Sequence, residues 1–140
     1  PMLGRFEAGS VLECVVAAHD PGLQLSTLTF NGGELRVPAL EAPPGTRLRA
    51  RLRARDVAIA LEDPTGLSIT NRVRGVVSEV TPREGPYVDI TVDAAGTLIH
   101  ALVTRESCQR LALAPGREVI ALIKAVALDS RTVGYTRRAR

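Results

Sequence analysis

The chain has 140 residues with a net charge of +3, and 45% of its residues are hydrophobic, 24% charged and 3% aromatic. This composition is typical of a soluble globular protein, long enough for one ordinary domain or two small barrels, and no apolar run approaches the roughly 20 residues of a membrane-spanning helix. Aromatic side chains are too few for the stacking platforms of a single-stranded nucleic-acid barrel. We therefore expect neither a nucleic-acid partner nor direct membrane insertion.

The first half of the chain predicts four strands, over residues 10–18, 23–30, 34–37 and 47–55. Asn31-Gly32-Gly33 is a strong hairpin signal between the second strand and the third. The fourth alternates arginine with leucine or alanine, so we expect an apolar face inside a barrel and a stripe of five arginines outside. Such a stripe is compatible with a nucleic-acid surface, but a solvated strand face is the simpler interpretation.

The second half repeats this order, with strands predicted over residues 72–80, 87–92 and 97–103, a helix from Thr104 to Leu111, and a last strand over 119–128. Pro44-Gly45 and Pro115-Gly116 lie 71 positions apart, and at this offset Arg53 aligns with Lys124. The pattern indicates an internal duplication. We predict an all-β fold of two tandem OB-like five-stranded Greek-key barrels, with one short helix before the last strand of the second. The predicted divisions are a first lobe over 1–66, a second over 67–130 and a basic tail over 131–140.

The last predicted strand contains Lys124, the single lysine of the chain, in an otherwise apolar run. By alignment with the first lobe, its outward face is expected to hold Lys124 together with Ile120, Leu122, Val126 and Leu128. An apolar face outside a small barrel predicts an interface, either with the other lobe or with a second subunit. An ammonium group on such a face needs an anion or hydrogen-bond acceptors, unless its side chain extends to solvent.

Three groups of side chains suit a small oxyanion. Thr104 and Ser107 offer hydroxyls at the start of the predicted helix, Lys124 offers a positive charge, and Ser68, Thr70 and Asn71 open the second lobe with polar groups. Each group has a structural alternative, namely helix capping, a solvent-exposed lysine and an ordinary turn. No catalytic triad or carboxylate pair stands out, and Cys14 and Cys108 do not form a metal or redox motif. The sequence therefore predicts binding without catalysis, a metal ion or a cofactor.

Three motifs resemble the molybdate-binding (Mop) domain: Ser68-Ile69-Thr70-Asn71, Val103-Thr104-Arg105-Glu106-Ser107 and Ala121-Leu122-Ile123-Lys124-Ala125. The wider chain resembles the C-terminal regulatory (TOBE, di-Mop-like) region of the ATP-binding subunit of molybdate ABC importers. The resemblance implies a homodimer of OB-like lobes that binds molybdate or tungstate at the shared interface. Its ligand contacts would come from Ser68, Thr104, Ser107, Lys124 and the backbone at Ala125. Related domains usually have arginine where this chain has Thr70.

The leading hypothesis is a cytoplasmic regulatory domain that binds molybdate or tungstate and feeds back on its own importer. It implies a parent chain with an ATPase domain, partner subunits in the membrane and a location at the inner face of the cell membrane. The alternative is a structural module that dimerises the ATPase subunit and no longer binds oxyanion, as Thr70 would permit. A soluble molybdate store and an OB-fold nucleic-acid binder are further alternatives. Because the chain begins Pro1-Met2, we expect a segment of a longer protein.

Overall fold

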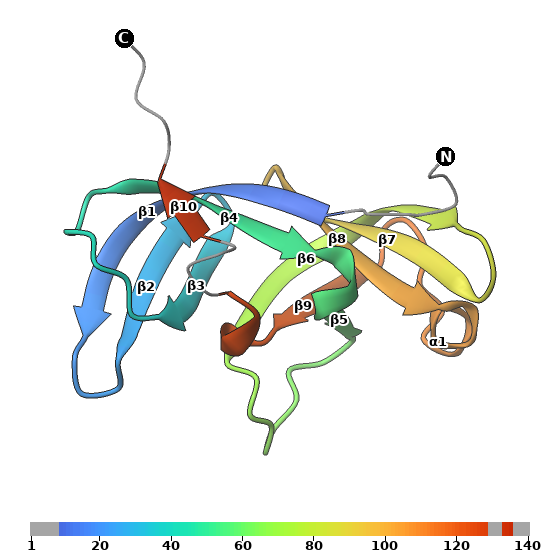
Figure 1. Cartoon of the computed structure of the whole chain (residues 1–140). Coiled ribbons are helices and arrows are strands. Elements are labelled where there is room, and N and C mark those ends of the chain that lie inside the picture. Colours follow the sequence, from blue (N-terminus) through green and yellow to red (C-terminus); the bar gives the residue numbers. More distant parts are fainter. Residues whose placement is uncertain (1–8, 129–132, 136–140) are drawn as a thin grey trace, which may run out of the picture.

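The computed structural model describes residues 9–128 and 133–135, which form ten strands, one α-helix and two 3-10 helices (Figure 1). The strands of the first sheet are β1 (Gly9–Asp20), β2 (Leu25–Phe30), β3 (Gly33–Pro38), β4 (Arg47–Arg53) and β10 (Val133–Tyr135). Those of the second are β5 (Val57–Ala60), β6 (Asn71–Pro82), β7 (Tyr87–Ala94), β8 (Thr97–Thr104) and β9 (Glu118–Ile123). The helices are η1 (Ala54–Asp56), α1 (Arg105–Arg110) and η2 (Ala125–Ala127).

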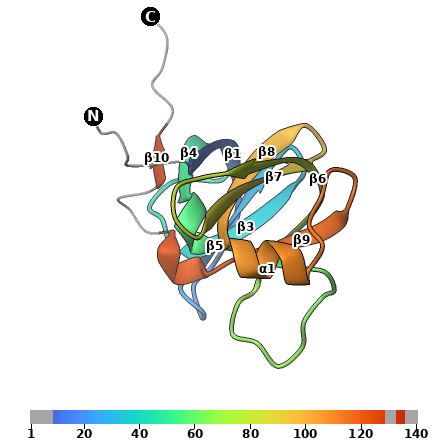
Figure 2. The same ribbon diagram turned by 90° about the vertical axis from the view of Figure 1, so that its right-hand side faces the viewer.

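The predicted all-β fold of two duplicated five-stranded lobes with one short α-helix is confirmed. The two antiparallel sheets have the strand orders β10-β4-β1-β2-β3 and β5-β9-β6-β7-β8. Helix α1 precedes β9 and lies at the end of the molecule formed by the second sheet, nearest the viewer in Figure 2. Within the described ranges, no helix has the length and apolar character needed to cross a bilayer.

The two sheets exchange their last strands, which the sequence did not predict. The chain leaves β4 through η1 and enters β5, which pairs with β9 of the second sheet; it leaves β9 through η2, and β10 then pairs with β4 of the first. Strand pairing therefore crosses the predicted division at residues 66 and 67, and that division stays a prediction. Residues 133–135 of the predicted basic tail form β10, and residues 131, 132 and 136–140 lie outside the described residues.

The expectation of a continuous strand from 119 to 128 is wrong, because β9 ends at Ile123 and a 3-10 helix follows. Alternation of faces stops there: Leu128 is 1% exposed within the core, whereas Val126 is 79% exposed. Ile120 and Leu122, expected on an outward interface, are 3% and 7% exposed in the single chain. They lie between β5 and β6, the neighbours of β9 in the sheet. This face is therefore largely covered without a second subunit.

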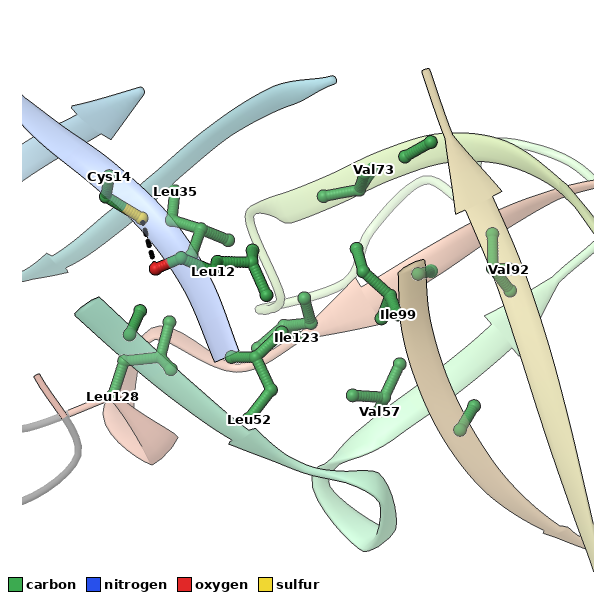
Figure 3. Close-up of a cluster of buried hydrophobic side chains, with 14 of the residues drawn as sticks. Leu12, Cys14, Leu35, Leu52, Val57, Val73, Val92, Ile99, Ile123 and Leu128 are labelled. Carbon is green, nitrogen blue, oxygen red and sulfur yellow. Dashed lines mark hydrogen bonds between the residues drawn. The ribbon is translucent and has the colours of Figure 1, made fainter. Parts of the chain in front are cut away.

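One continuous core joins the two lobes, as Figure 3 shows. Leu12, Leu35 and Leu52 come from the first sheet, while Ile99 and Ile123 come from the second, and all five are at most 3% exposed. In β4 the predicted alternation holds, since its leucine and alanine side chains are buried and its arginines exposed. Burial of apolar surface between the sheets fixes the relative position of the two lobes.

Candidate functional site

A cavity of about 810 Å³ lies where η1, β5, the junction of β8 and α1, and the end of β9 meet. Much of its wall is apolar: Val57, Ile59, Leu61, Ile69, Leu102, Val103, Leu111 and Leu122. Polar and charged side chains complete the wall: Arg55, Asp56, Glu62, Thr104, Ser107, Arg110 and Lys124. The cavity thus brings together Thr104, Ser107 and Lys124, three of the seven side chains or backbone positions that the sequence predicted for a site.

Thr104 and Ser107 form the N-terminal cap of α1, which is the structural alternative considered for them. Thr104 is extended, and its Oγ1 accepts a hydrogen bond from the backbone N–H of Ser107 at 3.1 Å. The Thr104 hydroxyl in turn donates to Ser107 Oγ at 3.1 Å, and Arg110 donates to the same Oγ at 3.4 Å. Ser107 Oγ therefore accepts two hydrogen bonds here and keeps its own proton to donate. Capping and ligand contact by Ser107 are compatible.

Lys124 stands directly after β9 as the N-cap residue of η2, with φ −67° and ψ 133°. Its side chain is exposed at the cavity wall, and its ammonium makes no hydrogen bond or ion pair with any residue in 9–128 or 133–135. Two other charged side chains on the wall are in ion pairs: Arg110 contacts Glu106 at 3.0 Å and Asp56 contacts Arg53 at 2.9 Å. Lys124 is therefore a cation that an anion in the cavity can meet without breaking an ion pair with these described residues.

The duplicated lobe explains why the Lys124 ammonium has no carboxylate to bind within its own 3-10 turn. Arg53 precedes η1 as Lys124 precedes η2, with closely similar backbone angles of φ −76° and ψ 137°. In the first lobe, Asp56 at the end of η1 binds Arg53 Nε at 2.9 Å. Ala127 occupies the equivalent position, 71 residues later, and has no charge to offer. The same backbone turn therefore presents a cation that is paired within the turn in the first lobe, and in the second lobe a cation that is unpaired among the described residues.

Ser68 and Thr70 lie on the segment 61–70 between β5 and β6, here called the arm, which projects from the body in both ribbon views (Figures 1 and 2). Both residues are exposed and neither lines the cavity, although Leu61, Glu62 and Ile69 of the same arm do. Ala125 is half-buried in η2 and likewise absent from the wall. Within one chain, the cavity therefore does not include Ser68 or Thr70, and Ala125 is next to Lys124 but not on the cavity wall.

Asn71 has a different place from the one the sequence suggested. It is 3% exposed, its Oδ1 accepts from Arg36 N at 2.7 Å, and its Nδ2 donates to Arg36 O at 2.9 Å. Arg36 belongs to β3, an edge strand whose outward N–H and C=O groups need partners. The amide therefore joins the two lobes, and we leave Asn71 out of the proposed ligand contacts.

Residues 67–129 match the TOBE domain family. The second lobe is a TOBE domain. The chain is 40% identical over 134 residues to the molybdenum import ATP-binding protein ModC of Mesorhizobium japonicum, and 45% identical over 129 residues to ModC 1 of Azotobacter vinelandii. These matches cover 96% and 91% of the chain but 36% of each relative. The chain thus spans about a third of the length of the curated relatives it matches.

A solved structure is similar over nearly the whole chain. It is that of the cytoplasmic molybdate-binding protein ModG with molybdate bound, with a TM-score of 0.78 and 25% sequence identity. The similarity covers 90% of this chain and 95% of the ModG chain. It therefore includes the first lobe and the TOBE domain together, in agreement with the duplicated OB-like architecture.

The sequence missed the role of Arg72, in β6 of the TOBE domain. Its guanidinium donates to the carbonyl oxygens of Ile69 and Pro64 and to the carboxylate of Asp63, all on the arm. These bonds compete with any use of Arg72 as a substitute, two residues further on, for the arginine that related domains have at the position of Thr70. An arginine just beyond a turn-rich segment that carries Asp63 was the sequence signal for such a role, but the arm conformation that brings the two together is not set locally.

Proposed function

We propose that this chain is a regulatory domain that binds molybdate or tungstate in the cavity beside Lys124. The observation that carries the proposal is a single cavity that joins a lysine without a described partner to the hydroxyls of Thr104 and Ser107. A tetrahedral oxyanion needs this combination of positive charge and hydrogen-bond donors. The resemblance to ModC proteins and to molybdate-bound ModG supports molybdate as the anion.

The proposed regulation is feedback on a molybdate ABC importer. In this proposal the chain is part of an ATP-binding subunit, at the cytoplasmic face of the membrane, whose ATPase domain and membrane partners lie outside the 140 residues. Bound anion would favour the arrangement of regulatory domains that it contacts best. It can shift the equilibrium between two such arrangements only by the difference in its affinity for them. The fragment itself is proposed to bind and not to catalyse.

We further propose that the regulatory domain acts as a homodimer. An oxyanion of five heavy atoms fills on the order of 100–150 Å³, if each atom is given the ~30 Å³ of a water molecule. Most of the 810 Å³ cavity would then be left to something else. A second copy, bringing Ser68 and Thr70 on its exposed arm, would supply both bulk and polar groups. Sedimentation that shows a monomer at tens of micromolar, with and without molybdate, would contradict this part of the proposal.

Calorimetric titration of the 140-residue chain with molybdate, tungstate and sulfate tests the function directly. A charge-assisted contact is worth about 1.5–3 kcal/mol, so Lys124→Met is expected to weaken binding about ten- to a hundredfold. Arg51→Met is the matched control, because Arg51 is an exposed cation on β4 that does not line the cavity. An unchanged affinity in Lys124→Met, or an equal loss in Arg51→Met, would overturn the proposed site.

A structural dimerisation module without a ligand is the second candidate. It is favoured by Thr70, which lacks the guanidinium found in related domains, and by the engagement of Arg72 with the arm. This candidate predicts a dimer by sedimentation together with no heat of binding for any of the three anions. The regulatory proposal predicts saturable binding of at least molybdate or tungstate.

A further inference from the structure

We propose that Arg72 is a positioning residue, which sets oxyanion affinity by holding the arm that carries Ser68 and Thr70 rather than by touching the anion. This inference rests on the proposed function. The arm has no helix or strand of its own and projects from the body between β5 and β6 (Figures 1 and 2). Such a segment keeps one conformation only where contacts at its base offset the entropy of ordering it.

Arg72 supplies these contacts from the start of β6, just beyond the arm. Its Nε and one terminal nitrogen donate to Ile69 O at 3.3 and 3.1 Å, while the other terminal nitrogen reaches Pro64 O and Asp63 Oδ1. One planar group thus ties both ends of the arm, residues 63–64 and residue 69, to the same point on β6. Its side chain is 26% exposed, so these bonds are partly shielded from water.

The same bonds argue against direct contact between Arg72 and an anion. A guanidinium has five N–H groups, and four hydrogen bonds to the arm leave too few for the bidentate contact that makes arginine a strong oxyanion ligand. Turning Arg72 toward the cavity would release Ile69, which lines the cavity wall, and Asp63 with it. The guanidinium therefore acts through the arm. A site with a preorganised arm binds the anion more tightly, because the entropy of ordering the arm is not lost on binding.

Arg74 provides a matched control on the same strand. It reaches Asp63 Oδ2 at 3.6 Å but makes no described contact with the carbonyl groups of the arm, and its side chain is 72% exposed. Replacing Arg74 by glutamine removes one positive charge from the same neighbourhood and leaves the bonds from Arg72 in place. Any effect of net charge on oxyanion binding should therefore be common to Arg74→Gln and Arg72→Gln, whereas loss of the ordered conformation of the arm should be specific to Arg72→Gln.

The experiment combines hydrogen exchange of peptides covering residues 61–70 with calorimetric titration of molybdate, on the complete 140-residue chain. We expect Arg72→Gln to speed exchange in the arm and to weaken molybdate binding, each about tenfold, and Arg74→Gln to do neither. Arg72→Lys keeps the charge but has no planar fork, so it is expected to restore neither property fully. Thermal unfolding of each variant checks that the body remains folded.

Three results would overturn the positioning role in a chain that binds molybdate. Full recovery of affinity in Arg72→Lys would show that charge alone matters. Weaker binding in Arg72→Gln with unchanged exchange would indicate that Arg72 contacts the anion itself. Faster exchange with unchanged affinity would make the arm irrelevant to the site. If the parent chain binds neither molybdate nor tungstate, the proposed function itself fails, and the exchange data alone report what Arg72 does to the arm.

Discussion

Replacing Asn71 by alanine should destabilise the chain without altering its affinity for oxyanion. The substitution removes two hydrogen bonds, at 2.7 and 2.9 Å, and leaves the N–H and C=O groups of Arg36 without these partners on an edge strand. Each such bond contributes about 0.5–1.5 kcal/mol, and the half-buried position of Arg36 lets water replace them only in part. We therefore expect the free energy of unfolding to fall by about 2–3 kcal/mol.

Urea denaturation followed by circular dichroism measures this loss, and Asn31→Ala is the control. Asn31 is exposed and its amide donates one hydrogen bond, to Ala95 O at 2.8 Å, so its removal should cost about 0.5 kcal/mol. Asn71→Asp should be at least as harmful as Asn71→Ala, because a carboxylate accepts from Arg36 N–H but is repelled by the Arg36 carbonyl oxygen.

Two results would refute this reasoning. If Asn71→Ala and Asn31→Ala had equal, small effects on unfolding, the amide of Asn71 would not hold the lobes together. If Asn71→Ala instead weakened molybdate binding and left unfolding unchanged, Asn71 would belong to the ligand site that the sequence first suggested. Titration of both variants under conditions where each is fully folded distinguishes these outcomes.

Three more predictions concern single positions. Thr70→Arg should tighten molybdate binding about tenfold by restoring a guanidinium while Arg72 holds the arm, and an unchanged calorimetric affinity would contradict this. Burial raises the pKa of Cys14 from 9.0 to about 11, so the thiol ionises at lower pH in the unfolded chain than in the folded one, and stability falls as the pH rises from about 9 to 11. Urea unfolding should show a loss of about 1.4 kcal/mol in the free energy of unfolding at pH 10, and Cys14→Ala should not show it. Gly75→Ala should lower the free energy of unfolding by about 1–3 kcal/mol, because a Cβ there would lie 2.6 Å from Val92 Cγ1 and 2.7 Å from Asp93 O. An unchanged melting temperature would mean that β7 shifts to accommodate the methyl group.

Local patterns were sufficient for much of the fold. Alternation in Arg47–Arg53 predicts which side of β4 is buried, because successive side chains of a strand point to opposite faces. The Thr104 cap follows from the chemistry of a helix start, and the duplication follows from the repeat of Pro-Gly and of a basic residue at the same distance after it. Alternation and capping depend on neighbours a few residues apart, and the repeat is visible in the sequence itself, so the order of residues alone determined these features.

Contacts between distant segments decided the rest. Composition favoured a strand through Ala125–Ala127, but the chain turns there and later continues as β10 against β4, while β5 pairs with β9. The choice of partner strand depends on which edges the folded sheets leave open, and no local period encodes it. For the same reason Asn71 and Arg72, adjacent in sequence, have separate roles: one amide satisfies an edge strand of the other lobe, and one guanidinium holds the arm. Side-chain chemistry determined what each can bond, and the tertiary structure decided which groups come within reach.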